Sequence, residues 1–197
     1  MAAEPHHVMM SVEEYLDFLR NSPDVRYEFI DGQIYMLAGG TTNHSLIAAN
    51  MIRELGFLLR GGPCRVYTSD MLVQVSENRY VFPDVVVSCD ERDRGVSDML
   101  HYPRLIVEVL SPSTERRDRG KKFSYYRACP TIQEYVLVET DEQAVEVYRR
   151  ASENLWTLHF FEADDYIELA SLKVSFPVAA LYENVEFSED TPDDPPA

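Results

Sequence analysis

Apolar residues recur along the chain at two spacings, which predict different secondary structures. Where they recur every three or four residues, one face of a helix is apolar, and where they alternate or run continuously, a strand is expected. The helical spacing occurs in three stretches, which are residues 11–21, 44–60 and 114–128. Ser11 and Glu14 have the pattern of a capping box at the start of the first stretch, and Gly61-Gly62-Pro63 ends the second.

Strand-forming runs occupy most of the remaining chain. Residues 27–30 and 33–37 flank Asp31-Gly32, and an Asp-Gly pair in this position predicts a hairpin because both turn residues take positive φ. Further strands are expected at residues 65–75, 80–87, 104–110, 134–139, 143–149 and 155–161. The runs 80–87 and 104–110 are almost continuously apolar, which is typical of central strands covered on both faces.

The order of these elements predicts an α/β fold with a mixed sheet. A helix, three strands, a helix and a strand form the core, which follows an N-terminal helix and hairpin and precedes a β-rich extension. Residues 164–182 are expected to form short strands and then a turn of helix. We expect residues 1–182 to be a single domain. Residues 183–197 hold six acids and no base, and we expect them to be an acidic, mobile tail.

Composition excludes several classes of protein. The chain has 197 residues, of which 45% are apolar, so it is long enough for a hydrophobic interior and too apolar for a disordered protein. No apolar run is long enough to span a membrane, and the N-terminus lacks the pattern of a secretory signal. Cys64, Cys89 and Cys129 are odd in number and far apart, which argues against a disulfide framework and favours a cytoplasmic protein.

The net charge of −16 disfavours a general nucleic-acid coat protein, because binding to phosphate draws on Lys and Arg. The charge is unevenly spread, since acids gather at both ends of the chain and bases gather in residues 116–127. We call residues 116–127 the basic strip, and its bases are Arg116, Arg117, Arg119, Lys121, Lys122 and Arg127. A polyanionic substrate is compatible with this pattern but is not implied by it.

Two acids interrupt the predicted central strands. Asp84 is the only acid in residues 80–87, and Glu108 is the only acid in residues 104–110. A lone carboxylate is costly to remove from water unless it is protonated, paired or bound to a metal. If the two strands are neighbours, repulsion between the two carboxylates either raises the pKa of one of them or is relieved by a bound divalent cation. Hard oxygen ligands favour Mg²⁺ or Mn²⁺ as that cation. The alternative is an ordinary salt bridge for each acid.

Pro83 precedes Asp84 inside the first of these runs. A proline in a strand marks an edge or an irregularity, because it cannot donate a ladder hydrogen bond. Such an irregularity either aims the Asp84 side chain into a cleft or is an ordinary bulge.

These residues resemble a known pattern. Pro83-Asp84 followed by Glu108-Val109-Leu110 is similar to the PD-(D/E)xK nuclease superfamily. The segment YEFIDG at residues 27–32 resembles the opening motif of the Uma2 family, also called DUF820. The Uma2 resemblance continues through EVLSPST at residues 108–114 and then through Asp118, Lys122, Tyr126 and Glu134-Tyr135. It covers roughly residues 10–150.

The resemblance implies a restriction-endonuclease-like αβββαβ core and an Mg²⁺- or Mn²⁺-dependent endonuclease that acts on DNA. By position, Asp84, Glu108 and the Val109 carbonyl would bind the metal, and Lys122 would complete the catalytic set. The superfamily lysine normally lies two residues after the second acid, where this chain has Leu110. Members of the family commonly carry a lysine on the following helix, and here that residue is Lys122.

Four further residues are accessory candidates. Asp118, Lys122 and Tyr126 are four residues apart and share a helical face, so Asp118 either orients Lys122 at the site or forms a solvent-exposed ion pair with it. Glu28 is either a third acid at the site or a polar hairpin position. His44 opens a helix, whose positive end disfavours the protonated imidazole, so it is either a neutral contact of the site or a residue of the capping loop.

The main interpretation is a DNA endonuclease in which Arg116, Arg117, Arg119 and Lys121 follow the DNA backbone. A catalytically silent nucleic-acid-binding or protein-interaction module on the same scaffold is the alternative, which Leu110 and the acidic net charge favour. A metal phosphodiesterase with another substrate is a third interpretation. Open sheet edges are compatible with a homodimer.

Overall fold

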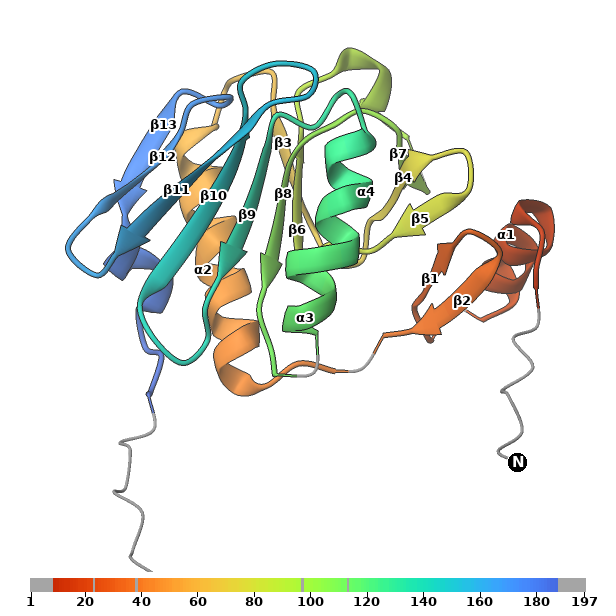
Figure 1. The fold of residues 1–197 in the computed structure, drawn as a ribbon, viewed down its shortest axis with the longest axis horizontal. Helices are drawn as coiled ribbons and strands as arrows, with labels where there is room; N and C mark the ends of the chain where they lie inside the picture. The colour runs from red at the N-terminus through yellow and green to blue at the C-terminus, as the bar shows by residue number, and fades with distance from the viewer. Residues whose placement is uncertain (1–8, 23, 38, 97, 113, 188–197) are drawn as a thin grey trace, which may run out of the picture.

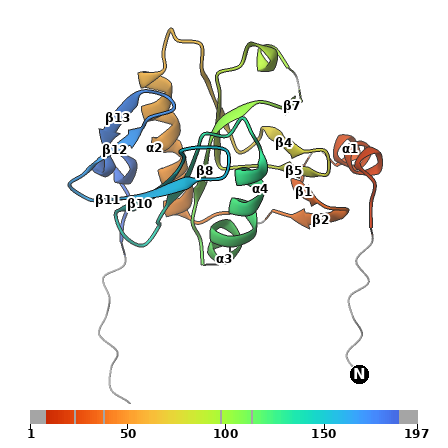
Figure 2. The same cartoon turned by 45° about the horizontal axis from the view of Figure 1, so that its top comes forward.

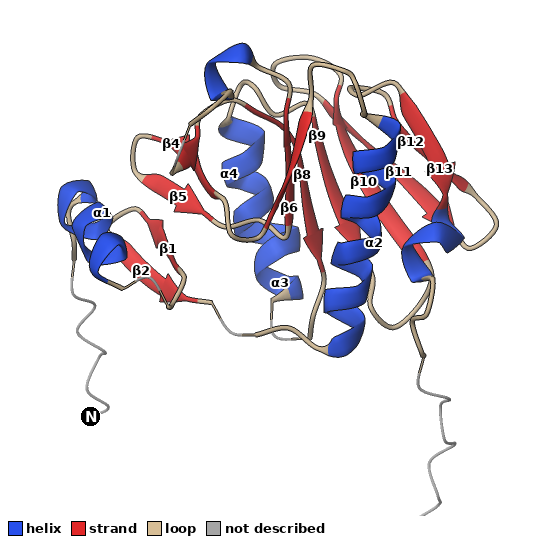
Figure 3. Ribbon diagram, turned by 180° about the vertical axis from the view of Figure 1, so that it is seen from behind, coloured by secondary structure: helices blue, strands red, loops and turns tan. Residues whose placement is uncertain are grey.

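A six-stranded mixed sheet forms the centre of the computed structural model, which describes residues 9–22, 24–37, 39–96, 98–112 and 114–187. The order across the sheet is β11 (Trp156–Glu162), β10 (Ala144–Arg150), β9 (Glu134–Val138), β8 (Pro103–Val109), β6 (Val85–Ser88) and β3 (Arg65–Thr68). Helix α2 (Thr42–Leu58) covers one face, and the helices α3 (Glu115–Arg117) and α4 (Phe123–Ala128) cover the other (Figures 1 and 3). Across the described residues, none of the helices is long and apolar enough to cross a membrane.

Successive side chains of the central strands point to opposite faces of the sheet and form a separate hydrophobic core on each face. Val85 and Val107 pack on the side of α2, whereas Val86 and Ile106 pack with Tyr126 of α4. β6 and β8 are neighbours in the interior of the sheet. The structure therefore confirms that the continuous apolar runs are central strands covered on both faces.

A second sheet carries the N-terminal part of the chain (Figures 1 and 2). Its order is β2 (Gln33–Met36), β1 (Tyr27–Ile30), β5 (Arg79–Val81), β4 (Leu72–Ser76) and β7 (Met99–Leu100). Tyr15 of helix α1 (Val12–Asn21) packs against Phe29 and Tyr80 of this sheet. The predicted hairpin is confirmed, because Asp31 and Gly32 both have positive φ, at 51° and 93°.

Two runs predicted as single strands are each divided between the two sheets. The run 65–75 forms β3 and β4, and the run 80–87 forms β5 and β6. The second division falls at residues 82–84, where Pro83 has no N–H to continue the ladder. As a result, Asp84 lies where the chain passes from the smaller sheet into the larger one.

The predicted helix over residues 114–128 contains a wider turn in its middle. α3 leads into the π-helical segment η2 (Asp118–Lys122), which leads into α4. The Phe123 N–H donates to the Asp118 carbonyl, which is the longer hydrogen bond of a π-turn. Both Asp118 and Lys122 are buried against the sheet.

The C-terminal extension packs on the α2 side of the sheet. It consists of the hairpin β12 (Tyr166–Leu169) and β13 (Val174–Pro177), followed by the helical turn η3 (Val178–Tyr182), as expected for residues 164–182. Glu134 of β9 is fully buried and accepts hydrogen bonds from the Arg149 side chain and from the Ala170 and Ser171 amides. This carboxylate therefore ties the central sheet to the hairpin. Most of the expected acidic tail, residues 188–197, lies outside the described residues.

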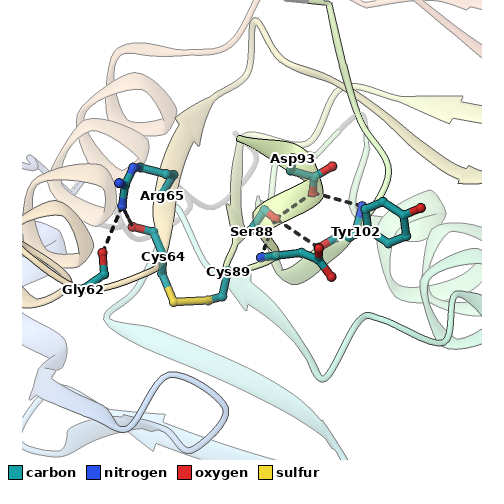
Figure 4. The surroundings of a disulfide bond; sticks show 8 residues. Gly62, Cys64, Arg65, Ser88, Cys89, Asp93 and Tyr102 are labelled. Atoms are coloured by element: carbon teal, nitrogen blue, oxygen red, sulfur yellow. Dashed lines mark hydrogen bonds between the residues drawn. A yellow bond between two sulfur atoms is a disulfide. The ribbon is translucent and has the colours of Figure 1, made fainter. Parts of the chain in front are cut away.

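The prediction that the cysteines are unpaired is wrong for two of them. Cys64 and Cys89 form a disulfide (Figure 4). Arg65 of β3 pairs with Ser88 of β6, so antiparallel pairing brings the two cysteines just beyond these residues opposite each other. Cys129 is free and buried. Separation along the sequence could not reveal this proximity, because it arises from strand pairing.

The disulfide should stabilise the fold. Its two cysteines are 25 residues apart, and a cross-link of that span restricts the unfolded chain enough to add about 3 kcal/mol to the free energy of unfolding. We expect a C64S/C89S variant to lose this amount in urea denaturation without reductant. Wild-type protein with reductant is the matched control and should resemble the variant. Titration of three free thiols in denatured, unreduced wild-type protein would contradict the pairing.

Candidate active site

Asp84 and Glu108 come from neighbouring strands of the larger sheet, and Glu108 lies on the face that α4 covers, where Tyr126 contacts it. β6 and β8 pair Val85 with Val107, so the next position along each strand brings Asp84 opposite Glu108. The Asp84 Oδ2 atom accepts the Val109 N–H at 2.8 Å, which fixes this carboxylate across the end of β8. Glu108 is 3% exposed. The two acids therefore come from neighbouring strands, as the interpretation of the sequence required.

The Lys122 ammonium lies among three buried carboxylates. Its Nζ atom is 2.9 Å from Glu108 Oε1, 3.2 Å from Glu28 Oε1 and 3.5 Å from Asp118 Oδ1. The Tyr126 hydroxyl donates to the same Glu108 oxygen at 2.6 Å. The helical face formed by Asp118, Lys122 and Tyr126 thus covers the sheet, and the alternative of a solvent-exposed ion pair is wrong.

These contacts shift the proton affinities of the site. Burial raises the pKa of Glu108 to about 8, because Lys122 offsets only part of the effect and the Asp84, Asp118 and Glu28 carboxylates add to it. Burial also raises the pKa of Asp118. For Lys122, burial disfavours the ammonium, but the surrounding carboxylates outweigh it and raise the pKa. Burial thus favours the protonated form of Glu108, whereas the surrounding carboxylates favour the charged form of Lys122.

His44 contacts Asp84 from the first turn of α2. The Thr41 hydroxyl caps this helix by accepting the His44 N–H, and the imidazole Nε2 lies 3.2 Å from Asp84 Oδ2. The hydrogen bond to Asp84 raises the pKa of His44, although burial lowers it. The sequence analysis expected the positive end of the helix to disfavour the protonated imidazole, whereas the contact with Asp84 acts in the opposite direction. His44 is a contact of the site.

Glu28 fastens the N-terminal hairpin to the helical segment. It is fully buried on β1, and its Oε2 atom accepts from Arg117 Nη2 at 2.5 Å. Its Oε1 atom accepts the Phe82 N–H at 3.3 Å and faces Lys122. The Arg117 guanidinium also lies over the Tyr35 ring at 4.7 Å. Glu28 therefore belongs to the buried cluster and is not an ordinary polar hairpin position.

Ion pairs engage much of the basic strip. Arg117 and Lys122 bind the buried carboxylates, and Arg119 forms ion pairs with Glu115, Glu139 and Glu146. Arg116 and Lys121 are exposed, and no ion pair to either occurs among the residues that the structure describes. The strip is therefore less available to a polyanion than its sequence indicates.

Tyr135 supports the site although the sequence analysis gave it no role. Its hydroxyl donates to the Asp118 carbonyl at 3.2 Å, and its ring lies 4.9 Å from that of Tyr126. Burial raises the pKa of Tyr135 well above its usual range. A hydroxyl-bearing residue in an apolar strand was the signal in the sequence, but its partner is a backbone carbonyl that only the fold brings near.

The oxygen atoms at this site fit a small divalent cation. Asp84, Glu108 and the Val109 carbonyl supply hard donors, which Mg²⁺ and Mn²⁺ prefer. The buried Asp118 Oδ1 atom has no hydrogen-bond partner within the described part of the chain. No group of three or more His, Cys, Asp or Glu side chains arranged to bind a metal occurs in that part of the chain. Two carboxylates and a carbonyl suit an ion that keeps several waters.

Comparison with known proteins identifies the family. The family model Uma2, described as "Putative restriction endonuclease", matches residues 12–179. The chain belongs to the Uma2 family. It is 39% identical over 179 residues to the "Uncharacterized protein slr1290" of Synechocystis sp. (strain ATCC 27184 / PCC 6803 / Kazusa), covering 90% of this chain and 94% of that protein. It is 31% identical over 153 residues to "Uncharacterized protein sll1609" of the same organism, covering 76% and 86%.

A solved structure confirms the predicted fold class. The crystal structure of a putative nuclease belonging to DUF820 from Anabaena variabilis ATCC 29413 matches with a TM-score of 0.71. The match covers 88% of this chain and 98% of that one at 19% sequence identity, so it supports a shared fold and no more than that. The Uma2 chain thus has the α/β, restriction-endonuclease-like fold, and its family supports a nuclease function in general terms.

The raised pKa of Glu108 makes stability depend on pH. The folded-state pKa of about 8 lies above the ordinary value of 4.5, so between these pH values the folded protein binds more protons than the unfolded chain. The free energy of unfolding should therefore fall as pH rises from about 5 to 8, by on the order of 3 kcal/mol from this group. Glu108→Gln should flatten the profile in urea denaturation with a chelator present. Exposed Glu153→Gln is the control, and parallel wild-type and Glu108→Gln profiles would contradict the shift.

Proposed function

We propose that this Uma2 protein is an Mg²⁺- or Mn²⁺-dependent endonuclease that hydrolyses DNA phosphodiester bonds. One observation supports the proposal above all others: Asp84, which directly precedes β6, and Glu108 of β8 come from neighbouring strands, and the Lys122 ammonium lies 2.9 Å from Glu108. Phosphodiester hydrolysis needs oxygen donors for a metal and a positive group for charge that develops on the phosphate. This cluster supplies both.

Each side chain has a distinct role in the proposal. Asp84, Glu108 and the Val109 carbonyl would bind the ion, which supplies Lewis acidity and lowers the pKa of a bound water. Glu108 must lose its proton to act as a ligand, and Tyr126 orients it through the 2.6 Å hydrogen bond. Lys122, positioned by Glu28 and Asp118, offsets negative charge on a phosphate oxygen or orients water.

A catalytically silent binding module remains the second candidate. The observation that favours it is that Lys122 and Tyr126 already donate hydrogen bonds to the Oε1 atom of Glu108. Leu110 occupies the position of the usual superfamily lysine. Such a module would show no Mn²⁺ binding that depends on Glu108, so calorimetric titration of wild-type protein and Glu108→Gln separates the two candidates.

Two further parts of the proposal concern setting and assembly. We place the protein in the cytoplasm, where DNA is available as a substrate. The Cys64–Cys89 disulfide removes the cysteine pattern as support for that compartment. We also propose a homodimer, since two copies provide one active site for each strand of a duplex. Light scattering tests this assembly.

Asp84→Ala should abolish metal-dependent cleavage. Loss of a direct metal ligand costs more activity than the about 10–100-fold that typically follows loss of a group hydrogen-bonded to such a ligand. Cleavage of plasmid DNA with Mn²⁺ measures the effect, and thermal unfolding shows that the variant is folded. Asp70→Ala is the matched control, because Asp70 is an exposed acid paired with Arg26 at the surface. Unchanged cleavage by purified Asp84→Ala would exclude this site.

Arg116 and Lys121 should contact DNA phosphates, because both are exposed and neither forms an ion pair among the described residues. Replacing either with Ala should weaken binding equally for different sequences and reduce the salt slope of the affinity by about 1. Fluorescence anisotropy over a salt series measures this. Arg20→Ala on α1 is the control, since Arg20 is exposed but far from the strip in sequence. Unaltered slopes would remove these residues from the interface.

A further inference from the structure

The outer edge of β11 is open. Within the described residues, β11 ends the six-stranded sheet and pairs with β10 alone, through seven consecutive residue pairs (Figure 1). That register contains no bulge, and the strand contains no Lys or Pro. Natural edge strands normally carry such features because they prevent pairing with another chain. The edge therefore offers a straight row of backbone donors and acceptors.

An apolar row follows this edge. Trp156, Leu158 and Phe160 alternate along β11 and share a face with Tyr148, which lies opposite Leu158 on β10. Trp156 packs edge-on against Phe123 of α4, at 5.7 Å between ring centroids. Beyond it, Leu158 is 40% exposed and Phe160 is 66% exposed. The apolar core beneath α4 thus continues outward to side chains that nothing described in this chain covers.

We propose that β11 joins two copies of this chain through antiparallel pairing about a two-fold axis at His159. In this register all seven residues of the strand find a partner. Leu158 of each copy lies opposite Phe160 of the other, so the exposed apolar row becomes a shared one. Trp156 of each copy lies opposite Glu162 of the other.

The charges at the two ends of β11 complement each other in this arrangement. The Arg150 guanidinium lies over the Trp156 ring at 4.5 Å and donates hydrogen bonds to backbone carbonyls. No carboxylate forms an ion pair with it among the described residues. Glu162 is exposed at the opposite end of the strand. Antiparallel pairing brings Glu162 of one copy opposite Trp156 of the other, next to the guanidinium that covers this ring, at both ends of the interface. A second copy therefore supplies the matching apolar row and the matching charges in one strand.

The interface is small, and this sets the expected affinity. A single added strand buries less than the ~800 Å² per partner of a standard interface, so we expect a dissociation constant on the order of micromolar. The opposite edge, β3, has four residues and exposed Arg65, and it offers no such apolar row. The proposal identifies the surface that dimerises, and it does not depend on whether the protein is a nuclease.

Sedimentation velocity of the full chain, across concentrations that bracket the micromolar range, tests the proposal. The wild type should show a monomer–dimer equilibrium. Phe160→Lys should raise the dissociation constant at least about tenfold, because both copies place an ammonium opposite Leu158. Phe57→Lys is the matched control, since Phe57 is also 66% exposed but lies on α2. A monomeric wild type, or a Phe160→Lys dimer as tight as the wild type, would overturn the interface.

Cross-linking tests the register. Directly opposed strand residues have Cα separations that a disulfide can span, and His159 is the residue that meets its own copy. Under mild oxidation, His159→Cys should form a covalent dimer on a non-reducing gel. Thr157→Cys is the control, because its opposite residue is Phe161 of the other copy. Cross-linking of Thr157→Cys, or none of His159→Cys in a sample that sediments as a dimer, would overturn the register.

Discussion

The buried Lys122 ammonium is the interaction on which this structure depends. Its three carboxylate partners come from different parts of the fold, since Glu28 lies on the N-terminal hairpin, Glu108 on a central strand and Asp118 on the π-turn beside Lys122 itself. Removing charged groups from water is unfavourable. Their mutual attraction offsets this desolvation only when the ion-pair geometry is close and the remaining hydrogen bonds are satisfied. Lys122 contacts all three acids, and Arg117 also pairs with Glu28, so these two cations hold the three parts of the fold together.

A π-turn lies at this cluster. A uniform α-helix over residues 114–128 would place successive side chains 100° apart, and the wider turn at Asp118–Lys122 changes that rotation where the helix crosses the acids of the sheet. On the opposite side of the cluster, Pro83 ends one strand and lets Asp84 accept the Val109 N–H in place of a ladder partner. Two local departures from regular structure, one in a helix and one in a strand, therefore build the site.

The sequence was informative where a signal is local. The Ser11–Glu14 capping box, the Asp31-Gly32 turn and the central position of the apolar runs all follow from neighbouring residues and are confirmed. The sequence was not informative where the interacting residues are far apart along the chain. Nothing near Arg119 in the sequence indicates that Glu139 and Glu146 engage it, and nothing near Cys64 indicates Cys89.

The division of residues 65–75 and 80–87 between two sheets shows the same limit. Each run has the apolar pattern of one strand, and the pattern is correct for both halves, since β4, β5 and β6 are mostly buried. The pattern does not show to which sheet each half belongs. That assignment is decided by hydrogen-bond partners elsewhere in the chain. The consequence reaches the candidate site, since the break in the second run is the place where Asp84 lies.

Burial of the cluster also determines the charge states in which its side chains can act. Lys122 contacts Glu28, Glu108 and Asp118, and the Arg117 guanidinium also pairs with Glu28, so two positive charges face three buried carboxylates. Burial and the neighbouring carboxylates raise the pKa of Glu108, so this carboxyl holds its proton to a higher pH than an exposed glutamate does. A divalent cation beside Asp84 would supply the missing positive charge and displace the proton, so proton release and metal binding are linked. If the cluster binds a metal as proposed, the internal ion pair and the metal centre would be two charge states of one cluster, with the cation concentration and pH deciding between them.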